Sequence, residues 1–189
     1  MSRRNLALIP IVLCLLSSIS LPARAAEIIF EAESDEFDDA VAEYQQIWAE
    51  DGSKIVKTLE RITCRSFEPE PILAIIYEGA SYSGYREIPM RLRASYSLDT
   101  KRGTLVHELS HRLIAGLVEK DVESHSVIFL FLYDAWVELW GREFADSQVA
   151  VESQRRGTFD YETAWKSALS LTAEVRSNRW QDFLRKRQQ

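Results

Sequence analysis

Between Thr100 and the C-terminus, the apolar residues of this chain recur at the three- and four-residue spacing of α-helices with few interruptions. The pattern predicts four helices, at 104–119, 124–153, 161–171 and 172–186. Gly157 interrupts the pattern between the second and the third of them. Because this half of the chain offers no strand pattern, any sheet must come from the residues before it, and most of the fold must be helical.

The half of the chain before Thr100 carries mixed signals. Apolar residues at helical spacing predict a helix over 37–48, which Gly52 should end, and a second helix over 53–62. Residues 72–77 and 85–95 have the composition of strands, and the Gly- and Ser-rich segment between them predicts a turn. We therefore expect two strands joined as a hairpin.

Together these patterns predict an α+β fold that is predominantly helical. A small N-terminal sheet or hairpin comes first, the helix at 104–119 follows, and a helical part completes the C-terminal side. Residues 26–189 are a suitable number for one domain with a single core. We therefore expect one domain over this range.

Residues 1–25 have the features of a secretory signal peptide. Arg3 and Arg4 provide the positive start, 6–21 is mostly apolar, and small residues follow at the expected cleavage site. The apolar stretch is interrupted by Pro10 and is shorter than the roughly 20 residues of a spanning helix. We expect cleavage, export to the periplasm or the medium, and no stable membrane insertion of the mature chain. Retention of the segment as an anchor is the alternative.

The charge balance and the cysteine content exclude two features. The chain carries 29 acidic residues against 23 Lys and Arg, and three of these basic residues lie in the signal segment. Such an acidic domain lacks the basic surface that nucleic-acid binding requires. Cys64 is the only cysteine after residue 25, so no intrachain disulfide can form. Hydrophobic packing or a metal ion must stabilise the fold.

The sequence His107-Glu108-Leu109-Ser110-His111 lies within the predicted helix at 104–119. Residues four apart share one face of a helix, so the two imidazoles can bind one zinc ion. Glu108 is turned by about 100° toward the rim of such a site, where a metal-bound water would lie. The spacing therefore predicts a site for one Zn²⁺ with Glu108 beside it.

The segment Val127 to Trp140 is apolar almost all round except for Asp134 and Glu138, which share one face of the predicted helix. A buried carboxylate needs a cation or strong hydrogen-bond donors. Zinc held by two histidines would be a suitable cation, and arginines are the alternative partners. The two acids are therefore candidates for completing the zinc site.

These residues resemble the zincin metallopeptidases, particularly the gluzincins, in which HExxH precedes an acidic ligand on a later helix. The resemblance implies a zincin-like fold and hydrolysis of peptide bonds through a zinc-bound water, with Glu108 as general base. It implies Asp134 as the third metal ligand and Glu138 as the carboxylate that orients a ligand histidine. Glu138 as the third ligand, in place of Asp134, is the alternative. The order Asp then Glu reverses the gluzincin pattern, and Arg112 adds an unexpected charge.

His125 and the strand at 85–95 complete the list of candidates. His125 lies nine residues before Asp134, about 180° round the predicted helix, so the two should not both reach one metal ion. It is a candidate oxyanion donor, an alternative ligand or a structural histidine. The strand could align a peptide or protein substrate along its exposed edge. A non-catalytic zinc-binding protein and a helical interaction protein are the alternative functions.

Overall fold

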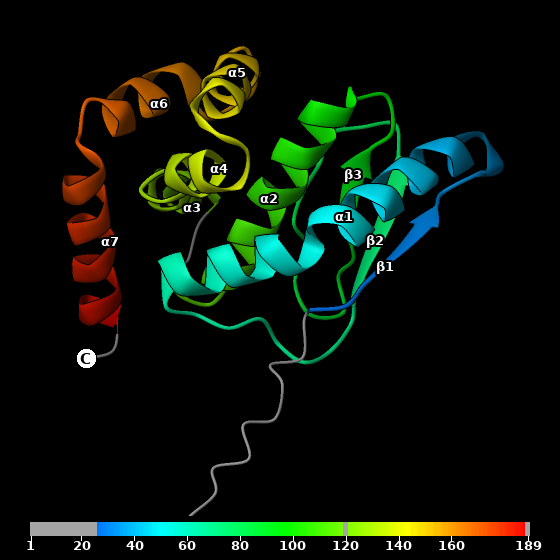
Figure 1. Ribbon diagram of the computed structural model, residues 1–189, viewed down its shortest axis with the longest axis horizontal. Coiled ribbons are helices and arrows are strands. Elements are labelled where there is room, and N and C mark those ends of the chain that lie inside the picture. Colours follow the sequence, from blue (N-terminus) through cyan, green and yellow to red (C-terminus); the bar gives the residue numbers. More distant parts are fainter. Residues whose placement is uncertain (1–25, 119–120, 188–189) are drawn as a thin grey trace, which may run out of the picture.

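The computed structural model describes residues 26–118 and 121–187, so the predicted signal peptide lies outside the described residues. The fold is α+β and predominantly helical, as the sequence predicts (Figure 1). In chain order the elements are β1 (Ile28–Ala32), the 3-10 helix η1 (Asp35–Phe37), α1 (Asp38–Thr63), β2 (Ile72–Tyr77), β3 (Met90–Arg93), α2 (Leu98–Ile114), α3 (Asp121–Ile128), α4 (Leu132–Trp140), α5 (Arg142–Ser153), α6 (Tyr161–Leu169) and α7 (Ala173–Arg187).

The three described strands form a parallel sheet in the order β1-β2-β3, so the predicted hairpin is wrong. β3 runs parallel to β2, with Ala74 opposite Met90, and residues 78–89 carry the chain back along the sheet. Within this connection Tyr82 pairs antiparallel with Arg91 through bonds of 3.0 and 2.9 Å. Part of the outer edge of β3 is therefore covered by the chain itself. A Gly- and Ser-rich composition predicts an irregular segment, but it does not distinguish a tight turn from a longer connection that runs back along the sheet.

The sequence patterns did not predict the strand β1. Its apolar run is only three residues long and is followed by acidic residues. Its side chains alternate, with Ile28 and Phe30 buried and Ile29 exposed. The buried face packs against α1, which connects β1 to its parallel neighbour β2. This is a βαβ unit, and the helix covers one face of the sheet.

α1 is one continuous helix where two were predicted. A glycine inside a helix costs about 1 kcal/mol relative to alanine, but here the ring of Trp48 lies over Gly52. A Cβ atom at this position would be 2.8 Å from that ring. Ile47 and Ile55, on either side of the glycine, are both buried. Packing of this continuous face keeps the helix intact, because tertiary burial outweighs local propensity.

α2 is the central element of the fold. It contacts α1, α3, α4, α5 and β3, and Figure 1 shows it between the sheet and the C-terminal helices. Leu105, Leu109 and Leu113 form its buried apolar face. The helix begins at Leu98, six residues earlier than predicted, because Ser97 caps it by accepting a hydrogen bond from the backbone of Thr100.

The predicted helix at 124–153 is three helices, α3, α4 and α5. Residues 129–131 interrupt it first, and Gly141, with φ of 89°, interrupts it again. The apolar run is buried on several sides, so its periodicity does not reveal the first break. This matters for the site, because a break reorients every side chain that follows it.

α2 and α5 approach closely at Gly103, since a Cβ atom there would lie 2.4 Å from Oε1 of the buried Gln148. We predict that Gly103→Ala lowers the free energy of unfolding in denaturant titrations. The cost of overpacking, about 1–3 kcal/mol, exceeds the gain in helix propensity of about 1 kcal/mol. Gly157→Ala is the control, because its Cβ atom would have no neighbour within 4 Å. Equal stability of the two variants would contradict the close packing.

Candidate metal centre

His107 and His111 occupy successive turns of α2, and their Nε2 atoms are 3.1 Å apart. His107 is almost completely buried at 1% exposure, whereas His111 is partly exposed. Burial lowers the pKa of His111 well below its ordinary value, and the neighbouring His107 and His125 act in the same direction. The structure therefore brings together the two histidines that the sequence predicts, and it favours the uncharged form of His111.

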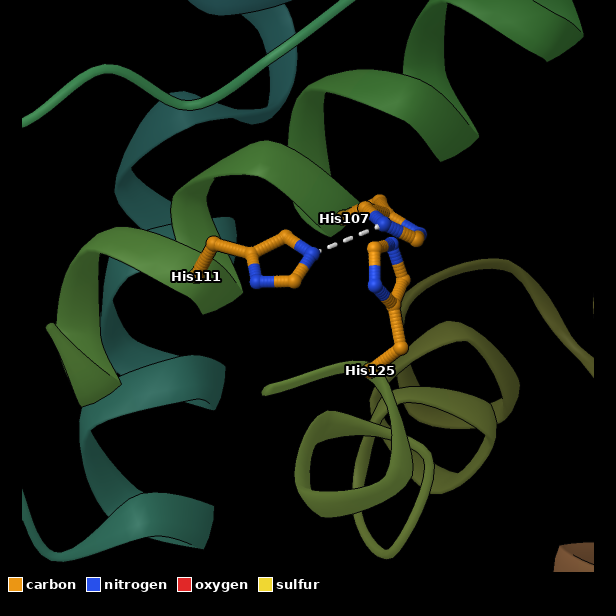
Figure 2. Close-up of side chains that lie close together, drawn as sticks. All are labelled: His107, His111 and His125. Carbon is orange, nitrogen blue, oxygen red and sulfur yellow. Dashed lines mark hydrogen bonds between the residues drawn. The ribbon is translucent and has the colours of Figure 1, made fainter. Parts of the chain in front are cut away.

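His125 on α3 approaches the same point (Figure 2). Its ring centroid lies 5.3 Å from that of His107 and 4.6 Å from that of His111. One nitrogen from each of the three rings lies within 4.8 Å of the others, which is close enough for one metal ion to contact all three. The alternative role of His125 as a metal ligand requires this position close to the other two rings. The predicted role of oxyanion donor does not require it.

The structure does not bring Asp134 or Glu138 into this histidine group. Both oxygens of Asp134 accept hydrogen bonds from Arg176, at 2.9 and 2.6 Å. Glu138 pairs with Arg61 and accepts a hydrogen bond of 3.0 Å from Thr58. The described residues therefore do not assemble the ligand set that the resemblance implied. The two acids have arginine partners, because the break between α3 and α4 turns them toward α7 and α1.

Glu152 on α5 is a site residue that the sequence did not single out. Its Oε1 lies 2.6 Å from Nδ1 of His107, and its Oε2 accepts a hydrogen bond of 3.0 Å from Trp165. Arg155 lies 3.4 Å from the same carboxylate, which is 2% exposed. Burial alone would raise the pKa of Glu152, but His107 and Arg155 lower it to about 2.

A sequence signal for Glu152 does exist. Ala145, Gln148 and Glu152 are spaced as one helical face, and all three are buried. A polar residue continuing the buried face of a helix needs a partner. The partners, Trp165 and His107, come from other parts of the chain, so the signal alone does not name the role.

Glu108 lies beside the histidines and is 3% exposed. Burial raises its pKa, while His107 and Arg155 oppose this effect. With His111, His125 and Tyr161 it lines a cavity of about 580 Å³, whose other wall includes residues 81–85. The carboxylate that the sequence predicts as a base therefore faces a space large enough for part of a peptide.

Tyr161, at the start of α6, also faces this cavity. Its hydroxyl oxygen lies 2.9 Å from Nε2 of His125, and the guanidinium of Arg155 lies 5.6 Å from its ring centroid. A phenol in this position can donate a hydrogen bond to a negatively charged oxygen near the histidines. The hydroxyl group of Tyr161 is thus a better candidate for this role than the ring of His125.

Comparisons with protein-family models, with curated proteins and with solved structures find no significant match. Among the described residues, no helix combines the length and the apolar character needed to cross a bilayer.

We predict that Glu152→Gln destabilises the metal-free protein by about 3 kcal/mol, because it leaves the largely buried Arg155 without its charged partner. Denaturant titration in the presence of a chelator measures this effect separately from metal binding. Glu143→Gln on the exposed face of α5 is the matched control and should change stability by about 0.5 kcal/mol or less. Equal stability of both variants would show that Glu152 does not have this structural role.

Proposed function

We propose that this chain is a zinc-dependent metallopeptidase whose zinc ion is bound by His107, His111 and His125. The observation that carries the proposal is the convergence of three imidazole nitrogens within 4.8 Å. Glu108, which follows His107 on α2, lines the same cavity as His111 and His125. A base, a metal site and a space for substrate thus coincide.

The chemistry of the donor set fits zinc. Three protein ligands with an open fourth position are the arrangement of catalytic zinc sites, and three imidazoles are a known set. Nδ1 of His107 faces Glu152, so Nε2 of the same ring is the atom left for a metal ion. A carboxylate in this position fixes the tautomer of a ligand histidine and increases its basicity. The 3.1 Å separation of two facing Nε2 atoms is also accounted for, because a shared cation would satisfy both lone pairs.

A bound zinc ion would supply Lewis acidity that activates a water molecule and polarises a carbonyl group. Glu108 takes a proton from the attacking water and later returns it to the leaving amine. Burial raises the pKa of Glu108, which makes the carboxylate a stronger base. Tyr161 donates a hydrogen bond to the oxyanion that develops on the substrate carbonyl.

The substrate is a peptide or an unfolded protein segment. The wall at residues 81–85 has extended backbone near Tyr82, which pairs with β3, so an extended chain can lie along this segment. This wall replaces the edge of β3 as the expected guide for the substrate. The acidic composition still argues against nucleic acid as a partner. On the pattern of residues 1–25, we also propose that the enzyme is exported.

The ligand assignment predicts the zinc content of purified variants of residues 26–189. The parent protein should contain one zinc ion per chain, and His125→Ala should lose it after dialysis. Asp134→Asn and Glu138→Gln should retain it, because their partners are arginines. Inductively coupled plasma mass spectrometry measures the content. Loss of zinc from Asp134→Asn with retention in His125→Ala would overturn the assignment.

The role of Glu108 predicts that Glu108→Gln retains zinc but loses activity. Removal of a general base should lower kcat/KM by about 100-fold or more. Hydrolysis of fluorescein-labelled, unfolded casein provides the assay, and Glu143→Gln is the control with an exposed carboxylate. A parent protein that contains zinc but cleaves no unfolded protein or peptide would favour the non-catalytic alternative.

A further inference from the structure

A second cavity, of about 480 Å³, adjoins the one that His111 and His125 line. The two cavities share Tyr85 and Ala115 as lining residues. Arg112, which directly follows His111 on α2, lines the second cavity and donates a hydrogen bond of 2.9 Å to the carbonyl of Ser83. It therefore connects the active-site helix to the wall along which a peptide would lie.

The inner part of this cavity carries two arginines without a direct ion pair, and Glu68 acts on Arg112 only through space. Arg112 and Arg65 both line the cavity and are partly buried. Over residues 26–118 and 121–187, neither arginine has a carboxylate within ion-pair distance, and Nε of Arg65 is buried without an acceptor. A guanidinium removed from water without an anion is unfavourable, and its fork of donors matches a carboxylate.

Acidic residues also line the cavity, but they lie at its exposed rim. Glu68, Glu70 and Glu87 are all exposed, and Glu68 accepts a hydrogen bond of 3.3 Å from Tyr85. Charges in contact with solvent are screened strongly, whereas partly buried ones are screened less. The floor is apolar, because Ile72 and Leu113 are buried there. The deep part of the cavity thus combines an apolar floor with two arginines.

We infer that this cavity is a substrate subsite that binds a carboxylate through Arg112 and Arg65. The inference rests on the proposed peptidase function and specifies its substrate class, peptides with a carboxylate close to the scissile bond. A chain that passes the histidines along residues 81–85 places a neighbouring residue beyond Tyr85, in the second cavity. The carboxylate is an Asp or Glu side chain or the C-terminus of the peptide. Arg112, the charge that departs from the zincin pattern, acquires a function in this way.

Binding to zinc-loaded Glu108→Gln protein tests the inference without cleavage of the probe. The probes are fluorescein-labelled peptides of neutral sequence in which one Glu is moved along the chain, matched peptides with Gln, and each peptide with a free or an amidated C-terminus. Fluorescence anisotropy should show about tenfold tighter binding when the carboxylate is correctly placed, as expected of one charge-assisted hydrogen bond.

The variants separate the arginines from general charge effects. Adding Arg112→Gln should abolish the preference for the carboxylate, Arg65→Gln should reduce it, and Arg112→Lys should retain part of it. Arg179→Gln, an exposed substitution on α7, is the control and should leave it unchanged. Unchanged zinc content of each variant shows that the site remains folded.

The two sources of the carboxylate give different results. Dependence on the position of Glu assigns the subsite to an acidic side chain, and dependence on the free terminus assigns it to the chain end. Equal binding of charged and neutral peptides, or no binding of any, overturns the inference. The peptidase proposal is judged separately, because wild-type protein can cleave neutral peptides without this subsite, and the subsite can bind peptides that the wild type does not cleave.

Discussion

The buried contact between Glu152 and His107 is the constraint on which the arrangement of the C-terminal half depends. A carboxylate that is 2% exposed is stable only if its oxygens have partners, and here they are His107, Trp165 and Arg155. These partners come from α2, α6 and the segment just after α5, so one charge fixes three parts of the chain. The same contact orients the ring of His107. Structural stability and the geometry of the candidate zinc site therefore depend on the same residue.

α2 connects the contact between Glu152 and His107 to the rest of the fold. Its leucine face is buried in the core, and its contacts extend from β3 to α5. His107, Glu108 and His111 are carried by a helix that is held on several sides, which suits a site that must keep ligand nitrogens in fixed positions. The remaining groups, His125 and Tyr161, come from α3 and α6 and depend on how these helices pack. The site is thus rigid on one side and assembled by tertiary contacts on the other.

The sequence predicts the parts of this site that depend on local geometry. The four-residue spacing of His107 and His111 determines their common face in any helix, and the structure agrees. The third member could not be predicted in the same way, because the choice between His125 and Asp134 depends on a break at 129–131 that an apolar run conceals.

The fold also divides into parts that the sequence predicts and parts that depend on tertiary contacts. The helical content and β2 follow from composition and periodicity, whereas the parallel pairing of β3 and the continuity of α1 through Gly52 depend on contacts between distant residues.

Buried charges give a way to separate structural groups from candidate functional groups in this chain. Asp134 and Glu138 looked like metal ligands because acids on an apolar helix need cations, and the structure supplies those cations as Arg176 and Arg61. Their requirement is met within the protein, so no ligand is needed to explain them. Arg112, in contrast, has no carboxylate in direct contact among the described residues, and nitrogens of His107, His111 and His125 converge within 4.8 Å of one another. The physical rule that explains Asp134 without a metal ion therefore also supports the anion proposed at Arg112, while the convergence of the imidazoles supports the proposed zinc site.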